Sequence, residues 1–107
     1  MTAQPSLLGR GQFDRIAKAL ADPRRFALLE MVAGQQEFAC SELCRRVPVS
    51  KATVSHHLKE LIRAGLVQAE RQGQYMNYRV RRDVLAAYSA ELLARTTPKP
   101  HLTESAG

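Results

Sequence analysis

The segment PVSKATVSHHLKELIRAGL, residues 48–66, constrains the fold of this 107-residue chain more than any other. Apolar residues recur along it at helical spacing, and Ser50 precedes them in the position of an N-terminal cap. Gly65 follows them, and glycine tolerates the left-handed backbone that ends many helices. The pattern therefore predicts a well-capped helix over residues 50–64.

This predicted helix has two chemically different faces when its residues are placed at about 100° intervals. The face expected to pack in the core carries Val54, Leu58, Leu61 and Ile62. The opposite face carries Ala52, Ser55, His56, Lys59 and Arg63. His57 falls at the edge of the core, where we expect it to be buried and hydrogen-bonded locally. One face thus serves packing, and the other presents hydrogen-bonding groups and positive charge.

Helices are also predicted before this segment. The apolar residues Phe13, Ile16, Ala17 and Leu20 predict a first helix over residues 11–21. Asp22 and Pro23 can begin a second helix that ends at Gly34. In that helix Phe26, Leu29 and Val32 are expected to face inward. A short third helix over residues 40–46 leads into the Ser50 helix, which gives a helix-turn-helix.

After Gly65 the apolar spacing changes from helical to alternating. Met76, Tyr78 and Val80 alternate with more polar residues, which predicts a half-buried strand in a hairpin that turns at Gln72-Gly73. A last helix is predicted over residues 83–94. The fold is therefore mainly α with a small β-hairpin (α+β), in the order ααααββα: a winged helix-turn-helix. We expect one domain over 12–94, a disordered tail over 1–11 and a flexible tail over 95–107.

The positive charge of the chain is concentrated in one region. Residues 45–82 hold nine basic and two acidic side chains, whereas the remainder holds seven basic and eight acidic ones, so +7 and −1 give the net charge of +6. Such a basic region is typical of a polyanion-binding protein. No nucleophile–base constellation or phosphate-binding glycine loop is present, so an enzyme is not predicted. No apolar run is long enough to span a membrane, and a cytoplasmic location is expected.

A recognition helix reads base edges in the major groove while cations hold phosphates. The side chains predicted to contact double-stranded operator DNA from the helix are Ser50, Lys51, Thr53, Ser55, His56, Lys59 and Arg63. At the hairpin tip they are Arg71, Gln72 and Gln74. The alternative is a winged-helix module that binds proteins and has no sequence-specific affinity for DNA.

Three stretches of the chain resemble a known family: LADPRRFALLEMV, SKATVSHHLKELIRAGLV and RQGQYMNYRV. Together they are similar to the arsenic-repressor (ArsR/SmtB) winged-helix regulators across residues 12–93. The resemblance implies a homodimeric bacterial repressor that binds a palindromic operator and is released by a metal ion or metalloid. It also implies a wing over residues 70–76 and a dimer contact through the terminal helices. The apolar residues predicted at that contact are Phe13, Ile16, Leu20, Leu85, Tyr88 and Leu92.

Cys40 and Cys44 lie where arsenite sensors of this family carry thiols, so the resemblance suggests an inducer site. This chain has no third cysteine, whereas trivalent arsenic prefers three sulfurs. Two thiols could bind an organoarsenical, or trivalent arsenic or antimony that has a further non-thiol ligand, or another soft ion. A disulfide and simple core packing beside Leu43 and Val47 are the alternatives. The family's other metal site, on the last helix, lacks its histidine because Leu85 stands there.

Overall fold

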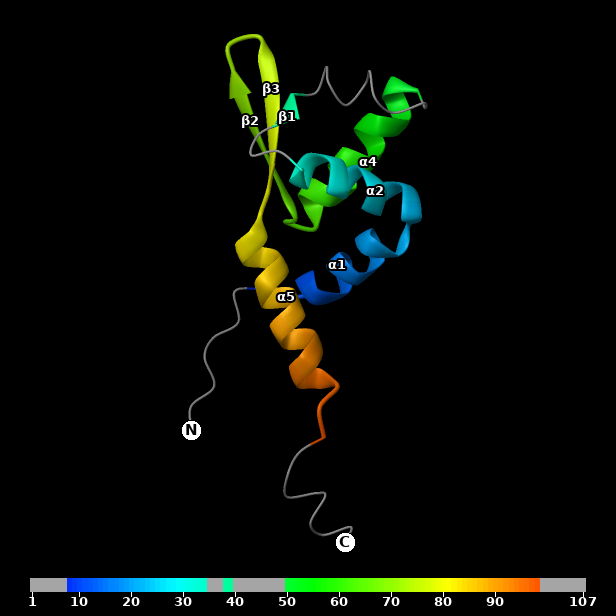
Figure 1. Ribbon diagram of the computed structural model, residues 1–107, viewed down its shortest axis with the longest axis vertical. Coiled ribbons are helices and arrows are strands. Elements are labelled where there is room, and N and C mark those ends of the chain that lie inside the picture. Colours follow the sequence, from blue (N-terminus) through cyan, green and yellow to red (C-terminus); the bar gives the residue numbers. More distant parts are fainter. Residues whose placement is uncertain (1–7, 35–37, 40–49, 99–107) are drawn as a thin grey trace, which may run out of the picture.

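The structure, a computed structural model, describes residues 8–34, 38–39 and 50–98. Its elements, in chain order, are α1 (Gln12–Ala21), α2 (Pro23–Ala33), β1 (Phe38–Ala39), α4 (Lys51–Arg63), β2 (Val67–Gln72), β3 (Tyr75–Val80) and α5 (Arg82–Arg95) (Figure 1). The predicted winged helix-turn-helix is confirmed. The predicted helix over 40–46, with Cys40 and Cys44, lies outside the described residues, as do the outer parts of both predicted tails.

The sheet has one strand more than the predicted hairpin. β2 and β3 form the hairpin, and β1 pairs antiparallel with β3, so the strand order is β1-β3-β2. A strand of two residues is too short to show an alternating pattern, so β1 was not predicted. The extra strand pairs with part of the free edge of β3 and makes β3 the central strand of the sheet.

The hairpin turn lies one residue later than predicted. Gln72 pairs with Tyr75, so the two turn residues are Gly73 and Gln74 rather than Gln72 and Gly73. Gly73 has a φ of 63°, which fits the first turn position that glycine occupies in type II′ hairpins. A turn containing Gly73 was predicted correctly, but its exact position depends on how β2 and β3 pair.

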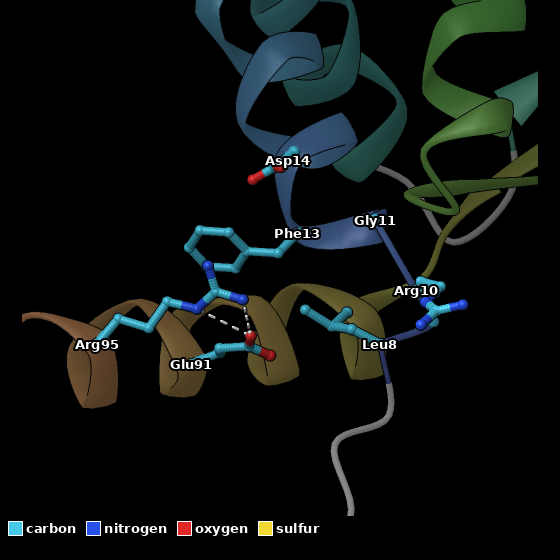
Figure 2. Close-up of a pocket in the computed structure, with 8 residues that line it drawn as sticks. Leu8, Arg10, Gly11, Phe13, Asp14, Glu91 and Arg95 are labelled. Atoms are coloured by element: carbon cyan, nitrogen blue, oxygen red, sulfur yellow. Dashed lines mark hydrogen bonds and ion pairs between the residues drawn. The ribbon is translucent and has the colours of Figure 1, made fainter.

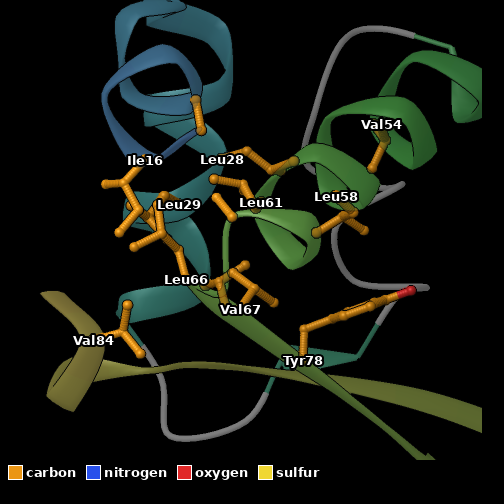
Figure 3. Packing of buried hydrophobic residues seen from close by; sticks show 13 residues of the cluster. Ile16, Leu28, Leu29, Val54, Leu58, Leu61, Leu66, Val67, Tyr78 and Val84 are labelled. Atoms are coloured by element: carbon orange, nitrogen blue, oxygen red, sulfur yellow. The ribbon is translucent and has the colours of Figure 1, made fainter. Parts of the chain in front are cut away.

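One hydrophobic core holds these elements together (Figure 3). It lies where α1, α2 and α4 meet the base of the hairpin and the start of α5. Its members include Ile16, Leu28, Leu29, Val32, Val54, Leu58, Leu61, Leu66, Val67, Tyr78 and Val84. Ile16, Leu61 and Leu66 are completely buried. The core therefore fixes one face of α4 and leaves the other face free.

Two residues predicted to face the core are substantially exposed. Phe26 is 43% exposed, because α2 buries Leu28, Leu29 and Val32 and its inner face is rotated away from Phe26. Ile62 is 37% exposed. The buried stripe of α4 runs through Val54, His57, Leu58 and Leu61, and Ile62 lies about 100° beyond its last member.

The predicted helix ends are confirmed by their hydrogen bonds. Asp22 Oδ1 accepts from Arg24 N at 2.9 Å at the start of α2, and Ser50 Oγ accepts from Thr53 N at 3.1 Å at the start of α4. After α4, Gly65 has a φ of 83°. Gln12 Nε2 of α1 donates to the carbonyl of Ala64 at 2.9 Å, which ties α1 to the end of α4.

Candidate nucleic-acid interface

The N-terminal end of α4 and the tip of the β2–β3 hairpin lie at the same end of the molecule's longest axis (Figure 1). α5 extends toward the opposite end. The two segments predicted to contact DNA therefore lie at one end of the molecule, although the second half of α4 and strand β2 separate them in sequence.

The outer face of α4 is exposed along its whole length. Ser50, Lys51, Ala52, Ser55, His56, Lys59 and Arg63 are exposed, and Thr53 is half-buried. Lys51 and Lys59 form no ion pair with another described residue. Arg63 contacts Glu60 at 3.3 Å and is still 71% exposed. The predicted face is therefore present as a surface of small, hydrogen-bonding and cationic side chains.

Ser50 and Thr53 have a structural task at the start of this face. Besides accepting from Thr53 N, Ser50 Oγ lies 2.9 Å from Thr53 Oγ1, so each hydroxyl is engaged by the other. The cap holds the first turn of α4 in place. The neighbouring side chains of Ser55 and His56 form no hydrogen bond with another described residue.

The predicted wing residues do not share one face. Arg71 pairs with Met76 on the side of the hairpin that continues the core face, whereas Gln72 pairs with Tyr75 on the outer side. Asn77 Nδ2 donates to Gln72 Oε1 at 2.7 Å, which fixes the Gln72 amide. Tyr75, which was not among the residues predicted to contact DNA, is 65% exposed beside the turn.

His57 is buried, as predicted, but its hydrogen bond is not local. Arg25 Nε, from α2, donates to His57 Nδ1 at 3.4 Å, and Nε2 is buried without a partner among the described residues. Burial is the main cause that lowers the pKa of His57, and Arg25 lowers it further while Asp22 opposes the shift. A contact between residues so far apart in sequence left no periodic signal.

Asp22 completes this interhelical cluster. Its Oδ2 lies 3.8 Å from Arg25 Nη2. Burial raises the pKa of the Asp22 carboxyl. Hydrogen bonds from the backbone N–H groups of Arg24 and Arg25, together with nearby positive charge, have the larger combined effect, so the pKa of Asp22 is lowered. Asp22 is therefore both the cap of α2 and the counter-charge of Arg25.

The surface formed by α1 and α5 is different in character. The rings of Phe13 and Tyr88 lie 4.9 Å apart, and the Arg95 guanidinium lies 3.9 Å from the centre of the Phe13 ring. Arg95 also donates to Glu91 at 3.0 Å beside a pocket of about 260 Å³ (Figure 2). Beyond this pocket α5 exposes Leu92 and Leu93, which are 42% and 66% exposed.

The predicted dimer residues are therefore only partly accessible. Phe13, Leu20, Leu85 and Tyr88 are half-buried, and Leu92 is exposed. Ile16 is completely buried within one chain, so its inclusion in the contact surface was wrong. Helical spacing identifies an apolar face but does not show which of its members the chain's own core uses. Leu93, which was not among the predicted contact residues, is more exposed than any of them.

Within residues 8–34, 38–39 and 50–98 no three His, Cys, Asp or Glu side chains are grouped to hold a metal ion. Asp83, on the last helix, is bound through both oxygens by Arg81, at 3.0 and 2.8 Å. None of the described helices combines the length and apolar character needed to cross a membrane.

Comparison with known proteins places this geometry in a family. The helix-turn-helix domain family matches residues 20–68. The HTH-type transcriptional regulator Rv2034 of Mycobacterium tuberculosis is 40% identical over 74% of this chain and 73% of its own length. The arsenical resistance operon repressor of Staphylococcus xylosus is 30% identical over 69% of this chain and 70% of its length.

A solved structure agrees. The homodimeric winged helix-turn-helix DNA-binding domain Mb0332 from Mycobacterium bovis has a TM-score of 0.64 and 30% identity, covering 78% of each chain. The fold and the exposed basic helix define a winged helix-turn-helix transcriptional regulator. Within that class, the chain belongs to the ArsR family.

Proposed function

We propose that two copies of this chain bind a palindromic operator and repress transcription. The observation that carries the proposal is the exposed outer face of α4, where Lys51 and Lys59 are without described counter-charges. Ser55 and His56 lie beside them and can bond base edges in the major groove. Arg71, Gln72 and Gln74 would contact the backbone from the wing, which lies at the same end of the molecule.

Dimerisation is proposed through α1 and α5. The exposed Leu92 and Leu93 adjoin the Phe13–Tyr88 contact, so an apolar surface remains that one chain does not cover. A two-fold dimer presents two α4 helices, which matches the two half-sites of a palindrome. The similar Mycobacterium bovis domain is a homodimer, which supports this arrangement.

We further propose that a thiophilic ligand at Cys40 and Cys44 releases the operator. The support is the chemistry of two neighbouring thiols and the similarity to an arsenical resistance operon repressor. The test compares operator release from the wild type and from the Cys40→Val, Cys44→Ala protein, using phenylarsine oxide, arsenite, antimonite and a mild oxidant. Release of the wild type alone supports sensing. Equal responses of the two proteins to every reagent mean that the thiols only pack in the core.

The central test of DNA recognition begins with selection of a duplex from a random-sequence library by the wild-type protein. His56→Ala is expected to lower affinity for the selected duplex by about 1–3 kcal/mol and to affect a random duplex much less. Lys18→Ala, on the exposed side of α1, is the control and should leave the ratio of the two affinities unchanged. If no sequence is enriched, the protein-interaction module is the better description.

A further inference from the structure

Three charged or polar side chains connect the start of α2 to the middle of α4. Asp22 Oδ1 accepts from the backbone of Arg24 and Arg25, and Asp22 Oδ2 lies 3.8 Å from Arg25 Nη2. Arg25, whose side chain is 14% exposed, donates through Nε to His57 Nδ1 at 3.4 Å. The N-terminal cap of α2 is thus linked through one guanidinium to a side chain of the proposed recognition helix.

This arrangement requires a neutral His57. Because Nδ1 accepts from Arg25, the neutral ring carries its proton on Nε2, which is buried. A second proton would sit on Nδ1 and face the Arg25 guanidinium, so the hydrogen bond would be replaced by repulsion between two cations. At 3.4 Å the bond itself is long, and the repulsion is therefore the larger part of the change.

The charged groups around His57 have opposing effects on its pKa. The groups of α2 and α4 that act on it are Asp22, Arg24, Arg25 and His56. Burial is the largest effect and lowers its pKa, Asp22 favours the charged ring, and the three basic groups disfavour it. As the pH falls below the ordinary value of 6.5, the unfolded chain therefore takes up a proton before the folded one, and the native arrangement loses stability.

The contact lies directly behind the surface that would read DNA. His56 and His57 are adjacent on α4, their ring centres are 5.7 Å apart, and His56 is exposed while His57 is 8% exposed. Any rotation or shift of α4 that separates His57 from Arg25 also moves His56 and its neighbours. Packed helices respond to such changes by moving as units.

We propose that Asp22, Arg25 and His57 form a proton-sensitive positioning contact that seats α4 against α2 and so sets operator selectivity. Arg25 and His57 act through the placement of the outer face and are positioning residues. The proposal rests on the proposed DNA-reading role of α4. It adds that acidification lowers selectivity through His57, a buried side chain that does not itself face DNA.

The first experiment needs no variant. The wild-type protein selects a duplex at about pH 7.5, and its affinity for that duplex and for a random duplex is then measured at about pH 7.5 and 5.5. The ratio of the two affinities should fall about fivefold or more at the lower pH. The ratio is the readout because a general gain of positive charge at lower pH strengthens both complexes. A ratio that stays constant overturns the proposal.

Two pairs of matched variants then locate the effect. His57→Gln keeps an oxygen that accepts from Arg25 but does not titrate, so its ratio should be independent of pH. His56→Gln should lower the ratio at both pH values and retain the wild-type fall. Arg25→Gln and Arg24→Gln remove the same charge from neighbouring positions. Only Arg25→Gln should lower the ratio at about pH 7.5, again about fivefold.

The outcomes separate this proposal from the proposed function. If no duplex is enriched, DNA recognition by α4 is wrong. If a duplex is enriched but His57→Gln loses selectivity with pH as the wild type does, the positioning contact is wrong. Thermal unfolding of each variant shows whether it folds. Should His57→Gln not fold, the Arg25→Gln and Arg24→Gln pair decides, and equal ratios for those two overturn the contact.

Discussion

α4 and α5 are helices of nearly equal length whose exposed faces differ in chemical character. α4 has 13 residues, buries four of them and exposes cations that have no described counter-charge. α5 has 14 residues and buries only Val84. Its Asp83 is paired with Arg81, its Arg95 is paired with Glu91, and two of its leucines are exposed. A cationic surface suits a polyanion, and an apolar surface with neutralised charges suits another protein surface. This difference is the one expected if α4 faces DNA and α5 faces a second copy of the chain, as proposed.

The largest expected effect tests the buried side of α4. Leu61→Ala should lower the free energy of unfolding by about 2–5 kcal/mol, because Leu61 is completely buried and its truncation leaves a cavity. Lys59→Ala, on the exposed side of the same helix, should change it by less than about 0.5 kcal/mol. Urea unfolding of both proteins measures the difference. Similar losses for the two would mean that α4 is not divided into a core face and a free face.

The next effect tests the apolar end of α5. Replacement of Leu92 and Leu93 by Glu should weaken self-association at least tenfold, which is about 1.4 kcal/mol, because charges would enter an apolar contact. Ala94→Glu adds a charge at an exposed position on another side of the helix and is the control. Sedimentation at micromolar concentration reports the dimer. A wild type that remains monomeric contradicts the assigned surface.

A third prediction contrasts the starts of the two helices. Ser50→Ala removes the side-chain cap of α4 and should lower the free energy of unfolding by about 1 kcal/mol. Arg81 stands at the N-cap position of α5 and forms no side-chain cap, so Arg81→Ala should act mainly through its exposed pair with Asp83, a loss of about 0–1 kcal/mol. Thermal unfolding compares the two. A larger loss for Arg81→Ala would reverse the order expected from the caps.

The smallest predicted effect concerns the wing. Arg71→Ala should weaken binding to selected and random duplexes alike and reduce the salt slope of log affinity by about one unit, as expected for one lost phosphate contact. Arg95→Ala removes the same charge from the α5 end, where the guanidinium is already paired, and should leave the slope unchanged. A changed slope for Arg95→Ala would indicate that DNA contacts the α5 end of the molecule and not the wing end.

Local chemistry was sufficient to predict most elements of the fold. Ser50 and Asp22 cap the helices that they were expected to cap, Gly65 follows α4 in the left-handed conformation, and the alternating residues after it form the hairpin. Each of these features depends on residues within a few positions of one another. Side-chain caps, left-handed glycines and apolar periods can therefore be predicted from sequence.

The remaining features depend on contacts between distant segments. The Arg25–His57 contact, the bond from Gln12 to the end of α4 and the pairing of β1 with β3 join residues that no local period relates. For the same reason, the exposure of Phe26 and Ile62 and the complete burial of Ile16 were mispredicted. A helical period shows that a helix has an apolar face. Only packing against the other elements decides which residues of that face enter the core, because each helix can rotate until the volumes fit. The sequence by itself thus determined the winged helix and its basic face, and the tertiary structure decided how α4 is held behind that face.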